Sequence, residues 1–201
     1  MPHMEKTLSS QEIFNGRVIL GTRARKTHSK SFDAFSSINY PNIAAVRDGR
    51  ILRYIEPEHG PEPEFYTQLE TRVGLLKLIP GTEPELLEYM LGRSRALVIE
   101  SFGVGGIPYY GDNAFEEKIA AMMENGVRVV ITTQVPHEGS NLSVYRVGHI
   151  IKEKYRVLEA SSMTTEAVIA KMMWALAYSD SRESFERLFT RPVGKDKLEN
   201  S

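Results

Sequence analysis

From residue 72 onward the chain alternates between short apolar runs and amphipathic stretches, and this alternation strongly limits the folds it can adopt. The apolar runs are residues 73–79, 96–99 and 127–131, and each has the length of a buried strand. Strands that alternate with helices favour a parallel sheet with helical crossovers. The pattern therefore predicts an α/β fold.

Two helices are expected between these strands. Thr82 and Glu85 have the spacing of a capping box before a stripe of apolar residues. Asp112 or Asn113 is a candidate cap for the second helix. Gly126 suits the left-handed residue that often follows a helix.

Two further helices are expected near the end of the chain. The first covers residues 165–177, and its Lys171 is expected to extend its charged end to solvent. The second begins near Ser181, where Asp180 and Glu183 predict a capping box. Both helices would cover the predicted sheet.

Residues 1–55 are less regular than the rest of the chain. They contain a strand at 17–20 and a hairpin signal, Asp48-Gly49, between apolar residues at 43–46 and 51–55. So few strands can bury little surface. We therefore expect the edges of strand 17–20 to be open to self-association, and we expect protease cleavage to concentrate before residue 56.

Three prolines, a glycine and four glutamates follow within residues 56–67. We therefore predict a division into residues 1–55, a linker at 56–72, and a domain at 73–201.

Composition excludes several classes of function. The 25 basic and 26 acidic residues are mixed, with no Lys/Arg cluster to bind a phosphate backbone, so nucleic acid is not an expected partner. Without cysteine there can be no disulfide, zinc–thiolate site or thiol nucleophile. The apolar runs are too short for a membrane span and the polar start has no signal-peptide core, so we expect a cytoplasmic protein.

Two polar segments follow predicted strands and could line one small-ligand site. The first, residues 100–108, contains three glycines, and the second, 132–140, contains hydroxyls, an amide, His137 and Glu138. Ligands of open parallel sheets bind at this end of the strands. The glycines alone favour a tight turn over a binding loop, and their G-x-G-G spacing is a weak nucleotide-binding signal. Neither a metal motif nor a G-x-S-x-G serine elbow is present, and we expect no cofactor.

Several segments together resemble one family. They are FNGRVILGTRARK at 14–26, FDAFSSINYP at 32–41, ALVIESFGVGGIP at 96–108, TTQ at 132–134 and MTTEA at 163–167 with Lys171. In this order they are similar to cytosolic (type I) L-asparaginases, over residues 14–190. The resemblance implies the carboxy-terminal domain of the asparaginase fold, preceded by a remnant of the amino-terminal α/β domain.

The family hydrolyses L-asparagine to L-aspartate and ammonia and assembles as dimers or tetramers. Its nucleophile is a threonine in a T-G-G-T motif, and a G-T-D-T motif with a later lysine completes the activating group. Neither motif occurs in these 201 residues. We therefore expect a truncated form without catalytic residues of its own.

The resemblance also implies a role for the loops after the strands, which in the family close a neighbouring active site or hold an effector site for asparagine. That effector site uses an arginine, an asparagine and a cysteine, and the matching positions here are Glu100, Gly106 and Val135. A carboxylate in place of the guanidinium should prevent binding of an amino acid's carboxylate in that pose. The candidate ligand-binding residues are Glu100, Gly105, Gly106, Thr133, Gln134 and Val135.

Two functions remain open from the sequence. The first is a truncated asparaginase homologue, inactive by itself. The second is a non-catalytic module that binds a small ligand, such as asparagine or a related amino acid, or forms a homo-oligomer or docks on an asparaginase-like subunit. A nucleotide-binding domain is a weaker third option.

Overall fold

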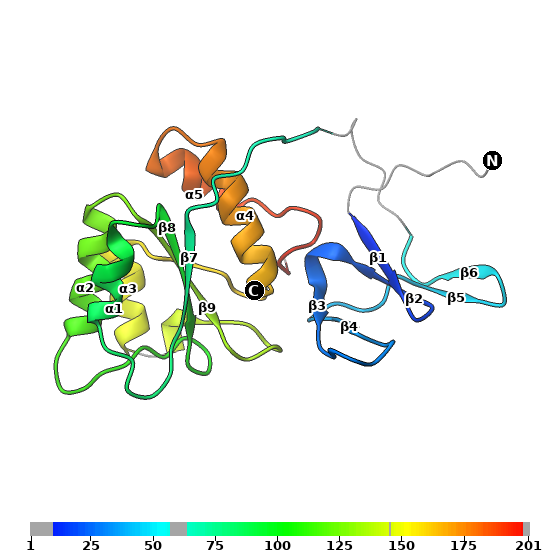
Figure 1. Cartoon of the computed structure of the whole chain (residues 1–201), viewed down its shortest axis with the longest axis horizontal. Helices are drawn as coiled ribbons and strands as arrows, with labels where there is room; N and C mark the ends of the chain where they lie inside the picture. Colours follow the sequence, from blue (N-terminus) through cyan, green and yellow to red (C-terminus); the bar gives the residue numbers. More distant parts are fainter. Residues whose placement is uncertain (1–9, 57–63, 145, 199–201) are drawn as a thin grey trace.

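The computed structural model describes residues 10–56, 64–144 and 146–198. The predicted linker at 56–72 is only partly covered, because 57–63 lie outside the described residues. The chain forms two groups of strands that lie next to each other, with helix α4 (Thr165–Ala177) and the last described residues between them (Figure 1).

The amino-terminal group is antiparallel. Its main sheet has the strand order β1-β2-β5-β6, and a two-stranded sheet pairs β3 with β4. The elements are β1 (Gln11–Phe14), β2 (Arg17–Leu20), the 3-10 turn η1 (Gly21–Arg23), β3 (Ala24–Lys26), β4 (Phe35–Ser37), β5 (Ala44–Arg47) and β6 (Arg50–Arg53).

The predicted hairpin is confirmed, since β5 pairs with β6 across Asp48 and Gly49. Both turn residues have positive φ, +50° and +71°, as the favoured two-residue hairpin turn requires. The expectation that β2 has open edges is wrong. Strands β1 and β5 flank it on either side, and the outer strands are β1 and β6.

The carboxy-terminal group is the predicted parallel sheet, with the order β10-β9-β8-β7. Every residue of β8 is buried, so this strand lies at the centre of the fold. The strands are β7 (Val73–Lys77), β8 (Ala96–Ser101), β9 (Arg128–Thr133) and β10 (Leu158–Glu159).

Helices cover both faces of this sheet, with α1, α2 and α3 on one face and α4 and α5 on the other (Figure 1). Successive strand residues point to opposite faces, so Leu97 and Ile99 pack with the first set, while Ala96 and Val98 pack with the second. The remaining elements are α1 (Glu85–Leu91), α2 (Ala114–Glu124), the 3-10 turn η2 (Leu142–Val144), α3 (Arg146–Tyr155) and α5 (Arg182–Thr190).

The helix ends depart from prediction in two places. The Thr82 hydroxyl bonds both the N–H and the C=O of Ile79, at 2.8 and 2.7 Å, and so does not cap α1. The capping box of α5 is one residue later than predicted and joins Ser181 with Ser184. Gly126 has the predicted left-handed backbone, with φ of +86°.

Lys171 does not extend to solvent, contrary to prediction. Its side chain is only 5% exposed, and its Nζ forms an ion pair with Asp196 at 2.6 Å. Across the described residues, no helix combines the length and the apolar character needed to cross a membrane.

Candidate functional site

The carboxyl ends of β7, β8 and β9 meet at one edge of the parallel sheet, where the candidate residues lie. The glycine-rich loop follows β8, and the polar segment at 132–140 follows β9. Because β8 pairs with both β7 and β9, its end is the middle of this edge. The fold therefore brings the two segments close to each other.

Glu100 is a buried carboxylate at the end of β8. Its Oε1 accepts a hydrogen bond of 2.7 Å from the hydroxyl of Thr165, the first residue of α4. Its Oε2 lies 4.0 Å from Nζ of Lys77 on β7. A carboxylate near a helix N-terminus is favoured by the helix dipole, so the end of α4 compensates part of the cost of burying this charge.

The glycine-rich loop is closed by its own backbone. Phe102 and Gly106 exchange N–H···O bonds of 2.9 and 2.7 Å, and the N–H of Gly105 also donates to the carbonyl of Phe102, at 3.0 Å. Gly105 has φ of +145°, and a Cβ there would lie 3.0 Å from a methyl carbon of Leu142. The amides of Gly105 and Gly106 are thus engaged within the protein rather than directed at a ligand.

Thr133, the last residue of β9, and Gln134 after it form hydrogen bonds to the segments that follow β7 and β8. The Thr133 hydroxyl donates to the carbonyl of Gly103 and accepts from the N–H of Val135, at 3.0 Å. The side-chain amide of Gln134 donates to the carbonyls of Leu78, at 2.6 Å, and Glu100, at 3.1 Å. The bond to Leu78 crosses from β9 to the residue that follows β7.

Of the six candidates, Val135 presents the most exposed side chain, at 44%. Glu100 and Thr133 are buried and bonded inside the protein. His137 and Glu138 are exposed, and the N–H of Glu138 donates to the side chain of Asn39, at 3.1 Å. Within the described ranges, no three or more His, Asp or Glu side chains lie together in a group that could bind a metal ion.

Comparison with protein families gives two matches. Residues 72–189 match the glutaminase/asparaginase carboxy-terminal domain, and residues 10–59 match the amino-terminal asparaginase domain. The first match alone covers more than half of the chain. The chain belongs to the glutaminase/asparaginase family.

The relatives that are similar in sequence include the following two proteins. An L-asparaginase of Thermococcus kodakarensis is 38% identical over 181 residues, which are 90% of this chain and 54% of that protein. A component of the glutamyl-tRNA(Gln) amidotransferase of Methanopyrus kandleri is 33% identical over 179 residues, which are 84% of this chain and 38% of that protein.

The solved structure of the thermostable L-asparaginase from Thermococcus kodakarensis has the same fold. It superposes with a TM-score of 0.87 at 35% identity, over 94% of this chain and 57% of that one. The present chain thus spans about half the length of the asparaginases that it matches.

A second polar cluster lies where the two groups of strands meet, and sequence patterns alone did not reveal it. Its centre is Arg23, which is completely buried although it belongs to the polar stretch after β2. Burial lowers the pKa of its guanidinium, and the nearby charge of Asp196 opposes that shift. The only sequence signal was the basic run at 23–26, which is typical of a solvated surface.

Proposed function

We propose that this chain is part of an asparaginase-like amidohydrolase, and that these 201 residues alone do not hydrolyse amides. The reaction of the complete enzyme would be hydrolysis of L-asparagine to L-aspartate and ammonia. One observation carries the proposal: a family member with neither T-G-G-T nor G-T-D-T among its residues has no activated threonine to attack the amide. We also propose that residues 1–55 are a remnant of the amino-terminal domain, 56–72 a linker and 73–201 the carboxy-terminal domain. The proposed location is the cytoplasm.

Ammonia release tests this proposal directly. The purified 201-residue protein is incubated with L-asparagine and with L-glutamine, beside a complete asparaginase as positive control. The expected release equals that of a protein-free blank. Sustained turnover beyond one equivalent per chain would refute the proposal, because a nucleophile outside the family's motifs would then be required.

A non-catalytic binding or assembly module is the second candidate. It is favoured by the similarity to proteins whose names describe one component of an amidotransferase, and hence a part of a larger enzyme. The outer strands β1 and β6 of the amino-terminal sheet are available for contact with another chain among the described elements. Homo-oligomerisation or docking on an asparaginase-like subunit would use such surfaces.

The proposed contacts of this module are the six residues at the edge of the parallel sheet, Glu100, Gly105, Gly106, Thr133, Gln134 and Val135. Because Glu100 is buried and its carboxylate is bonded to Thr165, Val135 is the residue of this set that a ligand in solvent would reach first. Calorimetric titration with asparagine and aspartate should give no heat if the edge only closes a neighbouring site. Binding that disappears in Val135→Asp would instead favour a ligand site.

Light scattering and co-purification with a complete asparaginase-like protein test the assembly role. A stable complex or a concentration-dependent dimer is expected. A monomer at all concentrations that retains no partner would exclude an assembly role.

A further inference from the structure

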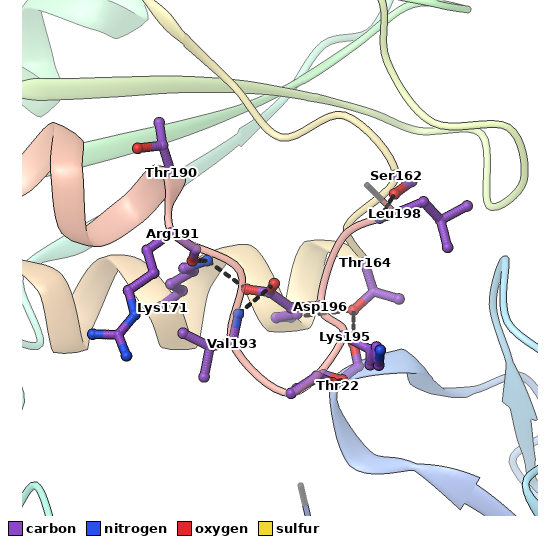
Figure 2. Close-up of polar contacts among 12 residues, drawn as sticks. Thr22, Ser162, Thr164, Lys171, Thr190, Arg191, Val193, Lys195, Asp196 and Leu198 are labelled. Atoms are coloured by element: carbon purple, nitrogen blue, oxygen red, sulfur yellow. Dashed lines mark hydrogen bonds and ion pairs between the residues drawn. The ribbon is translucent and has the colours of Figure 1, made fainter. Parts of the chain in front are cut away.

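Residues 191–198, here called the strap, follow α5 and lie between α4 and the amino-terminal strands. Figure 2 shows Lys171 of α4 on one side of the strap and Thr22 of the amino-terminal group on the other. The strap therefore contacts both parts of the chain.

On the side of α4, the strap is fixed by a buried ion pair. Nζ of Lys171 donates to Oδ2 of Asp196 at 2.6 Å and to the carbonyl of Arg191 at 2.5 Å. The other carboxylate oxygen of Asp196 accepts from the N–H of Val193 at 3.0 Å. Both charged side chains are at most 5% exposed, so water compensates little of either charge and each depends strongly on the other.

Burial is the main influence on the Lys171 ammonium. It lowers the pKa of Lys171, while the hydrogen bond and charge of Asp196 oppose this shift. Removing the carboxylate would leave a buried cation without a counter-charge, with only the carbonyl of Arg191 and the ring of Phe189, 5.7 Å from its nitrogen, beside it. Such a cation is costly, and the strap would no longer be fixed in this position.

On the other side, the strap binds the residues that follow β2. The Thr22 hydroxyl donates to the carbonyl of Gly194 at 2.5 Å, and Nε of Arg23 donates to the carbonyl of Lys195 at 2.6 Å. Gly194 and Lys195 both have left-handed backbone, with φ of +54° and +60°. This turn directs two successive carbonyls toward the amino-terminal strands.

The amino-terminal group has a small core to hold it in place. Among the described residues, its one hydrophobic cluster contains four buried side chains, those of Val18, Leu20, Ile43 and Ala44. Four further apolar residues of this group are buried outside that cluster, namely Ile19, Ala34, Ile38 and Ala45. Hydrogen bonds join it to the parallel-sheet part, such as the bond of 2.8 Å from Nη1 of Arg23 to the carbonyl of Ser162. Polar contacts are directional and are lost when either partner moves.

We propose that the strap, fixed by the Lys171–Asp196 pair, holds the amino-terminal strands against α4, so that breaking this pair releases those strands while the parallel sheet stays folded. The inference is independent of catalysis and of the proposed ligand edge. It assigns to Lys171, Asp196 and Arg23 a positioning role between two parts of the chain.

Hydrogen exchange of the full chain, read by mass spectrometry, tests the strap. In Asp196→Asn, amides in residues 17–26 and 35–39 should exchange about tenfold faster or more, because local opening becomes easier there. Amides of β8 and β9 should be unchanged. The matched control is Glu88→Gln, which removes an exposed ion pair with Lys118 and should alter neither region.

A second variant is needed if Asp196→Asn raises hydrogen exchange throughout the protein. Arg23→Met removes the two donors to Lys195 and Ser162 but leaves the buried ion pair intact. Exchange in residues 17–26 should again rise, with β8 and β9 still protected. Unchanged exchange at 17–26 in Arg23→Met, or in a folded Asp196→Asn, would overturn the proposal.

Discussion

Replacing Gly139 by alanine should destabilise the protein more than the same change at Gly126, although the φ angles of the two glycines are similar. Their φ angles are +82° and +86°. A Cβ at Gly139 would lie 2.5 Å from the carbonyl oxygen of Ser161 and 2.9 Å from the Cα of Ser162, whereas one at Gly126 would meet nothing within 4 Å. Comparing the two variants therefore separates the energetic cost of the close contact at position 139 from the cost of a left-handed backbone.

The two costs can be estimated from this geometry. A left-handed conformation costs alanine about 1–2 kcal/mol, and both variants share this cost. At position 139 the Ser161 carbonyl must also move by about 0.9 Å, the difference between 2.5 Å and the 3.4 Å of ordinary contact. That carbonyl accepts a bond of 2.9 Å from the N–H of Ser140, whose loss adds about 1 kcal/mol. We expect losses of about 2–3 kcal/mol for Gly139→Ala and about 1–2 kcal/mol for Gly126→Ala.

Urea unfolding followed by the fluorescence of Trp174 measures both losses, since this residue is the only tryptophan and lies on α4. The dependence of the free energy on urea should have the same slope in both variants, so that midpoints compare directly. Equal losses in the two variants would refute the reasoning, because the close backbone contact would then have no energetic effect.

Two further predictions concern charged side chains. Thr165→Val removes the hydroxyl that donates to buried Glu100 and should lower the free energy of unfolding by about 1–3 kcal/mol, whereas Thr165→Ser should retain most of it; urea titration distinguishes them. Hydrogen bonds from Arg72 lower the pKa of Glu70 from 4.5 to about 2, so the stabilisation by this carboxylate is complete above pH 4.5 and is lost as the pH falls through about 2. In Glu70→Gln the melting temperature should therefore fall less steeply over that interval, and an unchanged slope would contradict the assignment.

Strands and helices with a strong local signal were predictable from the sequence. Strands β8 and β9 were found because buried parallel strands are apolar at nearly every position. The edge strand β7 was found from its apolar run, although none of its residues is fully buried, and α4 because its apolar residues recur at helical spacing. The β5–β6 hairpin followed from the turn chemistry of Asp48 and Gly49.

Helix α3 was missed for a physical reason. Gly148 lies within it, and glycine in a sequence normally counts against a helix. In the structure a Cβ at this position would lie 2.6 Å from the carbonyl oxygen of Leu142, so close packing against η2 requires glycine there. Strand β10 was missed because it contains only two residues and pairs with β9 residues 28 positions earlier, as Leu158 does with Val130.

The candidate edge was partly predictable from the sequence, whereas the strap was not. Sequence order alone indicated that the segments after β8 and β9 would be neighbours, because parallel strands end at one side of a sheet. The internal partners of Glu100 and Gln134 were not predictable, since they belong to α4 and to the residue after β7. Lys171 resembled a surface lysine because Asp196, its partner, lies 25 residues later in a segment without periodic pattern.

The bond between Thr22 and Gly194 joins residues 172 positions apart, and this separation sets an order of events during synthesis. The strands of the antiparallel group leave the ribosome long before the residues that fasten them. The strands β7, β8 and β9 pair with residues 23 and 32 positions away, as Val73 does with Ala96 and Ala96 with Arg128, which is far less than 172. The part that is made earlier thus receives its bonds to the strap only when synthesis has reached residue 194.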